Sequence, residues 1–224
     1  MRSLDGQDLD IGDLSELDEI DAAATLIRRG KIVAIKGLGG FQLCCDATNG
    51  ITVNRLRQSK HRWHKPFALM AGDTEMIERY CRVSSQEKEL LQRQSAPIVL
   101  LETTSLRQLS RMMRPYQEGD GDLSSAIAPG ISTLGFMLPN TPLHHMLMAR
   151  LDKPIVCTSG NVSDEPQCID NADALKRLAG IADLILDHDR VIVNRLDDSV
   201  MRIVAGSPRM QRRARLLVRL RILH

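Results

Sequence analysis

The chain has 224 residues, enough for one α/β domain with a full core, and 43% of them are hydrophobic, which excludes a disordered chain. Only 3% are aromatic, so we expect an aliphatic, methionine-rich core and no base-stacking platform for single-stranded nucleic acid. The net charge of +2 is unevenly distributed, because residues 1–21 carry eight acids and residues 201–224 carry seven arginines and no acid. A basic end of this kind can bind nucleic acid or acidic lipid, although a solvated surface gives the same pattern.

The five cysteines form no Cys-x-x-Cys pair and leave an odd count, so neither a disulfide framework nor a zinc site is predicted. Cys44 and Cys157 lie in strand-like runs and are expected to be small buried apolar residues. The N-terminus lacks an apolar signal core, and no apolar stretch approaches the length of a membrane span. The composition therefore predicts a cytoplasmic protein without a membrane partner.

The first half of the chain alternates helical and strand patterns. Residues 1–17 are acidic and without periodicity, which is typical of a linker. Apolar residues at helical spacing predict a helix over residues 18–29, with Gly30 at its C-terminal cap. The next predicted elements are strands over residues 31–35, 67–70 and 97–101, and helices over residues 46–56, 73–80 and 84–94. Ser84 and Glu87 mark the start of the last of these helices.

Residues 102–130 contain few large apolar side chains and are predicted to be the least ordered part of the chain. The elements predicted after them are strands near residues 134–138, 154–157, 183–186 and 199–204, and helices over residues 141–150 and 171–178. The alternation predicts a single α/β (α+β-like) domain, with a twisted mixed sheet and flanking helices. We place the domain at residues 18–205, after an acidic linker-like segment (1–17) and before a basic C-terminal tail (206–224).

One apolar β-branched run ends directly in a glycine-rich loop, which contains Gly37, Gly39 and Gly40. Glycine lets backbone N–H groups approach a ligand and form an anion-binding nest. The loop matches neither a Walker A motif nor a complete Gly-x-Gly-x-x-Gly pattern. It predicts a site for a small phosphate-bearing ligand, without indicating which one.

A cationic loop follows, with four Lys or Arg residues and two histidines between residues 57 and 65. Triphosphates need several such donors, because charge must be neutralised on two or three groups at once. A solvated turn at a helix end would show the same composition. The spacing alone leaves both interpretations open.

Two polar segments follow or precede predicted strands. Residues 158–163 place small polar side chains after a strand, where ribose or phosphate oxygens often bind, although an ordinary turn has the same residues. Asp197 and Asp198 precede another strand and could meet magnesium or ribose, but such pairs are usually surface. For His144 and His145 no third metal ligand is visible, so structural roles are preferred and no metal site is predicted.

In combination, these segments resemble the YrdC-like superfamily, whose members make carbamoyl-type adenylates from ATP. The resemblance rests on residues 32–49, on Lys60-His61-Arg62 with Lys65-Pro66, and on the turn over residues 158–163, all in the expected order. It covers residues 20–205 and implies a single domain with a basic, concave nucleotide site.

Within that superfamily, the loop after the first strand is similar to the middle domain of HypF-type carbamoyltransferases, which mature [NiFe]-hydrogenases. The Pro-Thr-x-Thr-x-Tyr-Gly segment typical of threonylcarbamoyl-adenylate synthases is replaced by residues 36–42. Two departures from the HypF pattern stand out. Gln42 occupies a position that usually holds histidine, and the residues after Arg215 lack the family's Gly-Tyr continuation.

The resemblance implies ATP-dependent formation of carbamoyl-adenylate from carbamate derived from carbamoyl phosphate, with Mg²⁺ accompanying ATP. It implies three sets of site residues: catalytic Lys60, Arg62 and Lys65; nucleotide-binding Thr158, Ser159, Asn161, Ser163, Ser199 and Arg213; and substrate-binding Lys36, Gly37, Gly39, Gly40 and Phe41. Backbone amides of the glycine loop would hold the carbamate. The implied partner is a hydrogenase maturation protein that accepts the carbamoyl group on a C-terminal cysteine, and the acylphosphatase and transferase domains of the family are not seen in this sequence.

Two rival functions are compatible with the same residues. One is L-threonylcarbamoyl-adenylate synthesis for tRNA modification. The other is a module that binds double-stranded RNA or another nucleic acid through the cationic loop and basic tail, without turnover.

Overall fold

The computed structural model describes residues 2–3, 17–104, 121–162 and 165–213. Its strands are β1 (Arg2–Ser3), β2 (Val33–Lys36), β3 (Phe41–Asp46), β4 (Ala68–Met70), β5 (Ile98–Glu102), β6 (Thr133–Met137), β7 (Ile155–Ser159), β8 (Leu184–Leu186), β9 (Val200–Val204) and β10 (Ser207–Arg212). Its helices are α1 (Glu19–Arg28), α2 (Gly50–Ser59), α3 (Thr74–Glu78), α4 (Ser85–Leu91), the 3₁₀ helix η1 (Ser125–Ile127), α6 (Pro142–Met148) and α7 (Asn171–Arg177).

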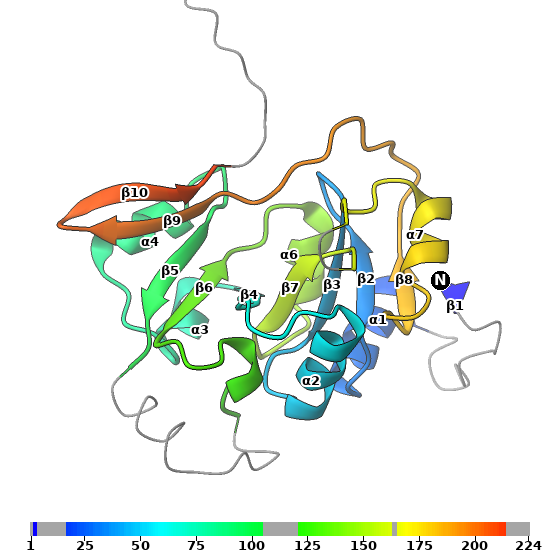
Figure 1. Cartoon of the computed structure of the whole chain (residues 1–224), viewed down its shortest axis with the longest axis horizontal. Helices are drawn as coiled ribbons and strands as arrows, with labels where there is room; N and C mark the ends of the chain where they lie inside the picture. The colour runs from blue at the N-terminus through cyan, green and yellow to red at the C-terminus, as the bar shows by residue number, and fades with distance from the viewer. Residues whose placement is uncertain (1, 4–16, 105–120, 163–164, 214–224) are drawn as a thin grey trace, which may run out of the picture.

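In the described ranges, the strands form one sheet in the order β1-β8-β2-β3-β7-β4-β6-β5-β9-β10 (Figure 1). The pairs β2–β8, β4–β6 and β5–β9 are parallel, and the other neighbours are antiparallel. The sheet is therefore mixed, as the sequence predicts. Helix α1 packs on α6 and on β2, β3 and β8, whereas α4 packs on β5 and β9.

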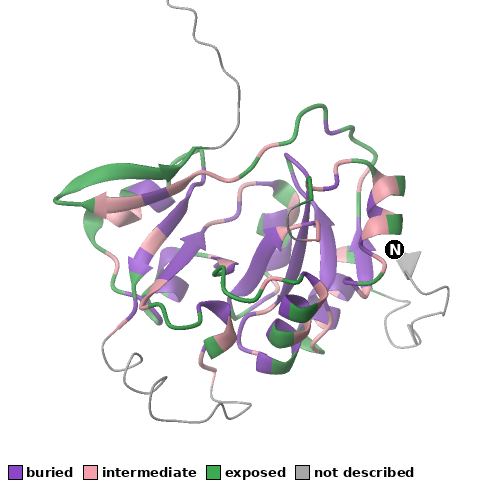
Figure 2. Cartoon of the chain, in the orientation of Figure 1, coloured by how far each residue is buried: buried purple, intermediate pink, exposed green. Residues whose placement is uncertain are grey.

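The core is aliphatic with methionine, as expected, and it also takes in all three phenylalanines, Phe41, Phe67 and Phe136. The central strands are almost wholly buried, whereas β10 is exposed along its length (Figure 2). Cys44 and Cys157 face each other across β3 and β7, with their Sγ atoms 3.7 Å apart, and both are buried. Their predicted role as small apolar core residues is confirmed.

Local signals explain where helices begin and end. The N-terminus of α4 carries a capping box, in which the Ser84 backbone N–H donates to Glu87 Oε2 over 2.8 Å. Gly30 follows α1 with a φ of 75°, a conformation that favours glycine, and its N–H donates to the Ile27 carbonyl.

Two expectations differ from the structure. The helix predicted from Asp46 begins instead at Gly50, because Asn49 is its N-cap and Asp46 ends β3, where its carboxylate accepts from Thr48. The strand-like run around Cys44 forms β3. Residues 207–212, assigned to the basic tail, form β10 and continue the sheet past residue 205. Most of the segment predicted to be least ordered lies outside the described residues.

Candidate functional site

The cationic loop that follows α2 is held in place by Arg57. This residue is 5% exposed, and its guanidinium donates to the carbonyls of Lys65 over 3.2 Å and Ile127 over 3.0 Å. It also bonds the Arg62 carbonyl. Arg57 therefore stabilises the conformation of the loop, and the side chains of Arg62 and Lys65 line the cavity where a ligand could bind.

Lys60 is more deeply buried than its predicted catalytic role suggests, with 1% of the residue exposed. Its ammonium donates to the Ser159 carbonyl over 2.6 Å and to the Asn161 carbonyl and Oδ1 over 2.5 and 3.0 Å. Burial, together with the charge of Arg62, lowers the pKa of Lys60 to about 7. Lys60 thus clamps the turn at the end of β7 to the cationic loop.

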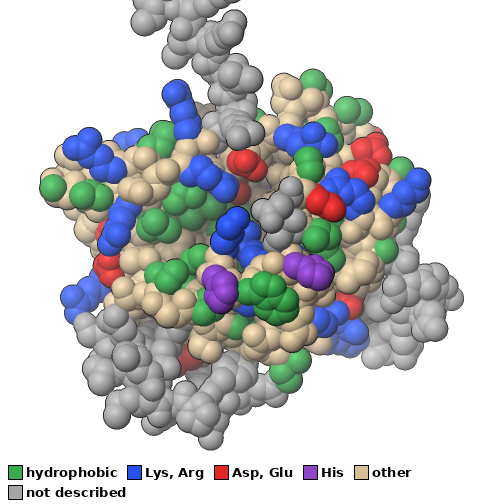
Figure 3. Space-filling view, viewed as in Figure 1, with side chains coloured by type: hydrophobic (Ala, Val, Ile, Leu, Met, Phe, Trp, Pro, Cys, Tyr) green, Lys and Arg blue, Asp and Glu red, His purple; other side chains and the backbone are tan. Residues whose placement is uncertain are grey.

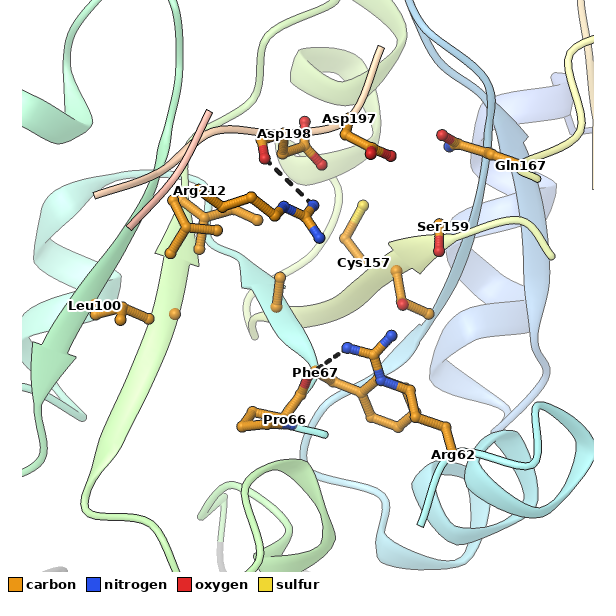
Figure 4. Close-up of a pocket in the computed structure, with 15 residues that line it drawn as sticks. Arg62, Pro66, Phe67, Leu100, Cys157, Ser159, Gln167, Asp197, Asp198 and Arg212 are labelled. Carbon is orange, nitrogen blue, oxygen red and sulfur yellow. Dashed lines mark hydrogen bonds between the residues drawn. The ribbon is translucent and has the colours of Figure 1, made fainter. Parts of the chain in front are cut away.

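The guanidinium carbon of Arg62 lies over the Phe67 ring, 5.3 Å from the ring centroid, and the guanidinium donates to the Pro66 carbonyl over 2.7 Å. Burial lowers its pKa, and the nearby charges of Arg57 and Arg212 add to that effect. Figure 4 shows Arg62 on one side of a cavity, with Arg212, Asp197 and Asp198 on the opposite side and Ser159 at the end of β7 between them. The guanidinium is therefore positioned at a concave surface and not in free solvent.

Three cavities adjoin at this place. The basic cavity, of about 670 Å³, is lined by Lys60, Arg62, Lys65, Ser159, Asn161, Glu165, Pro166, Gln167, Arg195, Asp197, Arg212 and Arg213. The central cavity, of about 260 Å³, includes Phe67, Cys157, Thr158, Ser159, Gln167, Asp197, Asp198 and Arg212. The glycine-side cavity, of about 440 Å³, includes Gly39, Gly40, Gln42, Asn140, His144, Gln167, Leu196, Asp197, Asp198, Ser199 and Arg213.

Gln167 and Asp197 line all three cavities, which makes them parts of one groove. Figure 3 shows Lys and Arg side chains around the middle of this face, with acidic side chains among them. A continuous groove with a cationic end and a narrower centre can accept an elongated anion such as a nucleotide.

The groove brings together most of the residues predicted from the sequence. Those that line it are Lys60, Arg62, Lys65, Thr158, Ser159, Asn161, Ser199, Arg213, Gly39 and Gly40. Lys36, Gly37 and Phe41 line none of the three cavities, and the Lys36 ammonium instead donates to the His188 carbonyl over 2.9 Å. Ser163 lies outside the described residues.

Two backbone amides of the glycine loop, which is predicted to form an anion nest, are occupied within the chain. The N–H of Gly37 donates to the Gly40 carbonyl over 2.9 Å, and the N–H of Phe41 donates to the Cys168 carbonyl over 2.8 Å. The glycines also allow close packing, because a Cβ on Gly39 would lie 2.6 Å from the Leu196 carbonyl oxygen. The loop is thus a tight turn against which residue 196 and Gln167 pack.

Sequence reasoning missed Gln167 and Arg212. Gln167 Nε2 donates to the Phe41 carbonyl over 2.6 Å, and Arg212 donates to the Asp198 carbonyl over 3.3 Å. Burial raises the pKa of the Asp198 carboxyl, and the charge of Arg212 opposes that rise. No motif marks Gln167, whereas Asp197 and Asp198 were noted as weak candidates for magnesium or ribose.

Among the described residues there is no group of three or more His, Cys, Asp or Glu side chains that could hold a metal ion. The described helices are all too short or too polar to cross a membrane. Asp197 and Asp198 offer carboxylate oxygens, which Mg²⁺ prefers, so these residues fit a magnesium ion whose other ligands would come from phosphates and water.

Known proteins resemble this chain over most of its length. The Sua5/YciO/YrdC family model, described as "Telomere recombination", matches residues 25–214. The carbamoyltransferase HypF of Synechocystis sp. is 48% identical over 203 residues, which are 90% of this chain and 25% of that protein. The threonylcarbamoyl-AMP synthase of Vibrio vulnificus is 28% identical over 147 residues, which are 63% of this chain and 71% of that protein.

Among solved structures, full-length HypF in a phosphate- and nucleotide-bound form superposes with a TM-score of 0.79 at 46% identity. The match covers 89% of this chain and 29% of that protein. The present chain thus spans about a quarter of the length of the HypF proteins it matches. It belongs to the Sua5/YciO/YrdC family, as a YrdC-like domain of the kind found in HypF carbamoyltransferases.

Proposed function

We propose that this domain binds ATP with Mg²⁺ and joins carbamate to the adenylyl group, which gives carbamoyl-adenylate and pyrophosphate. The observation that carries the proposal is the basic cavity, where Arg62, Lys65 and Arg213 converge beside the Ser159–Asn161 turn. A site with several cations suits a triphosphate, whose charge no single side chain neutralises. The nucleotide- and phosphate-bound HypF relative supports the proposal.

In this reaction a carbamate oxygen attacks the α-phosphorus of ATP, and the bond to the β-phosphate bridging oxygen breaks as pyrophosphate leaves. Such a transfer requires positioning and charge stabilisation more than covalent catalysis. Arg62 and Lys65 would neutralise the departing pyrophosphate, and Mg²⁺ held by phosphates and by Asp197 or Asp198 would assist them. Thr158, Ser159, Asn161, Ser199 and Arg213 would position the nucleotide.

Lys60 acts differently in this proposal from its predicted direct contact with phosphate. Its three bonds to the Ser159–Asn161 turn make it a positioning residue, which sets the turn against the cationic loop. Both the turn and the loop line the basic cavity. Lys60 would therefore control the width of the site that receives the phosphates.

The steps before and after adenylation belong to domains outside this chain. We propose that an acylphosphatase domain releases carbamate from carbamoyl phosphate. A transferase domain would then pass the carbamoyl group to the C-terminal cysteine of a hydrogenase maturation protein. The reaction would take place in the cytoplasm, in keeping with the five free cysteines.

ATP–pyrophosphate exchange tests the proposal directly. We expect exchange with carbamate, supplied as equilibrated ammonium and hydrogencarbonate, and its loss in Arg62→Ala but not in Lys153→Ala, which changes an exposed lysine outside the groove. Wild-type chain that binds no ATP and supports no exchange would contradict the proposal.

Threonylcarbamoyl-adenylate synthesis is the second candidate, because the Vibrio vulnificus synthase matches 63% of this chain. Exchange that requires both L-threonine and hydrogencarbonate would favour it over the first proposal. Binding of double-stranded RNA is tested in the same samples: affinity that falls steeply with salt and is insensitive to ATP would favour a nucleic-acid module.

A further inference from the structure

The glycine-side cavity contains two buried polar atoms that no described residue satisfies. They are Nε2 of His144 and Oε1 of Gln42, and both side chains line this cavity. His144 is 1% exposed and Gln42 is 8% exposed. Buried polar groups are almost always hydrogen-bonded, so two unsatisfied polar atoms on residues that line one cavity indicate that a ligand supplies the missing partners.

The tautomer of His144 follows from its other ring nitrogen. Nδ1 lies 2.9 Å from Asn140 Oδ1, and an amide oxygen can only accept, so Nδ1 carries the proton. Burial lowers the pKa of His144 to about 4, so the ring is neutral at physiological pH. Nε2 therefore has a free lone pair and is an acceptor.

Gln42 gives the cavity a second acceptor. It lies in β3, where its neighbours in the sheet are Ile35 on β2 and Ser159 on β7. Its Oε1 lies near Gly37, because a Cβ added to Gly37 would be 3.2 Å from that oxygen. A side chain at residue 37 would crowd Oε1, and glycine avoids that contact.

A ligand group that complements two acceptors must bring N–H or O–H donors. The glycine-side cavity shares Gln167, Asp197 and Asp198 with the central cavity and Arg213 with the basic cavity, so it adjoins the proposed nucleotide. Given the proposed function, the group that reaches it is the carbamoyl end of the adenylate, which carries an NH₂ with two donors. Hydrogencarbonate, which is similar in size and charge, has a single O–H donor and can therefore satisfy only one of the two acceptors.

We propose that His144 and Gln42 recognise the NH₂ group of the carbamoyl substrate and select carbamate over hydrogencarbonate and other small carboxylates. The proposal rests on the proposed function, since it needs a nucleotide in the groove to place the carbamoyl group. It assigns the selectivity to two side chains and not to the amides of the glycine turn, two of which are occupied within the chain.

The test uses two stable mimics of acyl-adenylates that differ in one group. These are 5′-O-(N-carbamoylsulfamoyl)adenosine, which ends in NH₂, and 5′-O-(N-acetylsulfamoyl)adenosine, which ends in CH₃. Titration calorimetry on the wild-type chain should show the carbamoyl mimic binding at least about tenfold more tightly, because the methyl group leaves the buried acceptors unsatisfied. Equal affinities for the two mimics would overturn the proposal.

Two variants locate the effect. His144→Leu and Gln42→Met should each reduce the preference for the carbamoyl mimic by about threefold or more, and leave the affinity for AMP unchanged. His145→Leu is the matched control, because His145 is exposed and outside the cavity, and it should keep the wild-type preference. An unchanged preference in both test variants would overturn the assignment to these residues.

The AMP titration separates this proposal from the proposed function. If the wild-type chain binds AMP but binds the two mimics equally, the nucleotide site stands and the recognition of the NH₂ group is contradicted. Wild-type chain that binds neither AMP nor either mimic contradicts the nucleotide function, and this inference falls with it. If one variant fails to fold, the preference of the wild type for the carbamoyl mimic and the result for the other variant still test the proposal.

Discussion

Lys60→Met separates two possible roles of this lysine. The structure predicts that it positions the turn at the end of β7, whereas its sequence context predicts direct contact with phosphate. Methionine keeps the length and apolar stem of the side chain but removes all three hydrogen bonds to Ser159 and Asn161. The variant therefore tests the clamp with little change in packing.

The expected loss can be worked from those bonds. Two of the three acceptors keep a partner, because the Asn161 N–H still donates to the Ser159 carbonyl and the Ser159 hydroxyl still donates to Asn161 Oδ1. The Asn161 carbonyl loses its donor, and an unsatisfied buried acceptor costs about 1–3 kcal/mol of unfolding free energy. For a domain of this size a loss of about 2 kcal/mol corresponds to a melting temperature lower by about 4–8 °C.

The assay combines thermal unfolding with ATP binding, and Lys65→Met serves as the comparison. Lys65 is exposed and lines the basic cavity, so its variant should lose ATP affinity but melt within about 2 °C of the wild type. Lys60→Met should lose both stability and affinity. If Lys60→Met instead melts like the wild type and loses only ATP affinity, the clamp is refuted and direct phosphate contact is favoured.

Three further outcomes follow from the same structure. Gly39→Ala should cost about 1–3 kcal/mol in urea unfolding, because its Cβ would lie 2.6 Å from the Leu196 carbonyl oxygen. Gly180→Ala, with no atom within 4 Å of its Cβ, should be neutral, and equal stabilities of the two variants would contradict the packing argument. The Lys60 side chain should titrate near pH 7 by carbon NMR, and a transition above pH 9.5 would show that the ammonium is not desolvated. The pKa of His144 falls from 6.5 in the unfolded chain to about 4 in the folded one, so the unfolded chain binds more protons between these values. This shift contributes about 3 kcal/mol to stability, which is present above pH 6.5 and is lost as pH falls towards 4. Urea unfolding at pH 7 and at pH 4.5 measures the loss, and the free energy of unfolding should differ less between the two pH values in His144→Leu than in the wild type.

The elements that could be predicted are those marked by regularly spaced apolar residues or by capping residues. The helix at residues 18–29 and the capping box at Ser84 were predicted because apolar spacing and cap chemistry act over a few residues. Strand β10 was missed because all six of its residues are exposed, so no alternation marks it. The start of α2 was misplaced because Asp46 resembles an N-cap, and nothing local shows that Asn49 fills that role instead.

The site could be predicted as a set of residue types but not as a set of contacts. The cations of the loop do line a groove with the Ser159–Asn161 turn. The sequence does not show which cations are free to bind a ligand. Lys60 lies far from residue 159 in the sequence, and only the folded structure shows that its ammonium already donates to the Ser159 carbonyl. Gln167 has no motif around it, and its position in the groove depends on the close approach that Gly40 permits.

The strand order has a consequence for how the chain folds during synthesis. Strand β2 needs β8 as its parallel neighbour, and β5 needs β9, yet β8 and β9 are synthesised well after β2 and β5. Until they emerge, β2 and β5 are apolar strands with one open edge each, and such edges are prone to pair with other chains. Asp197, Ser199 and Arg212 lie in the segment that follows β8, so the groove is completed only when these two edges are closed. We therefore expect ligand-binding competence and protection from aggregation to appear together in nascent chains.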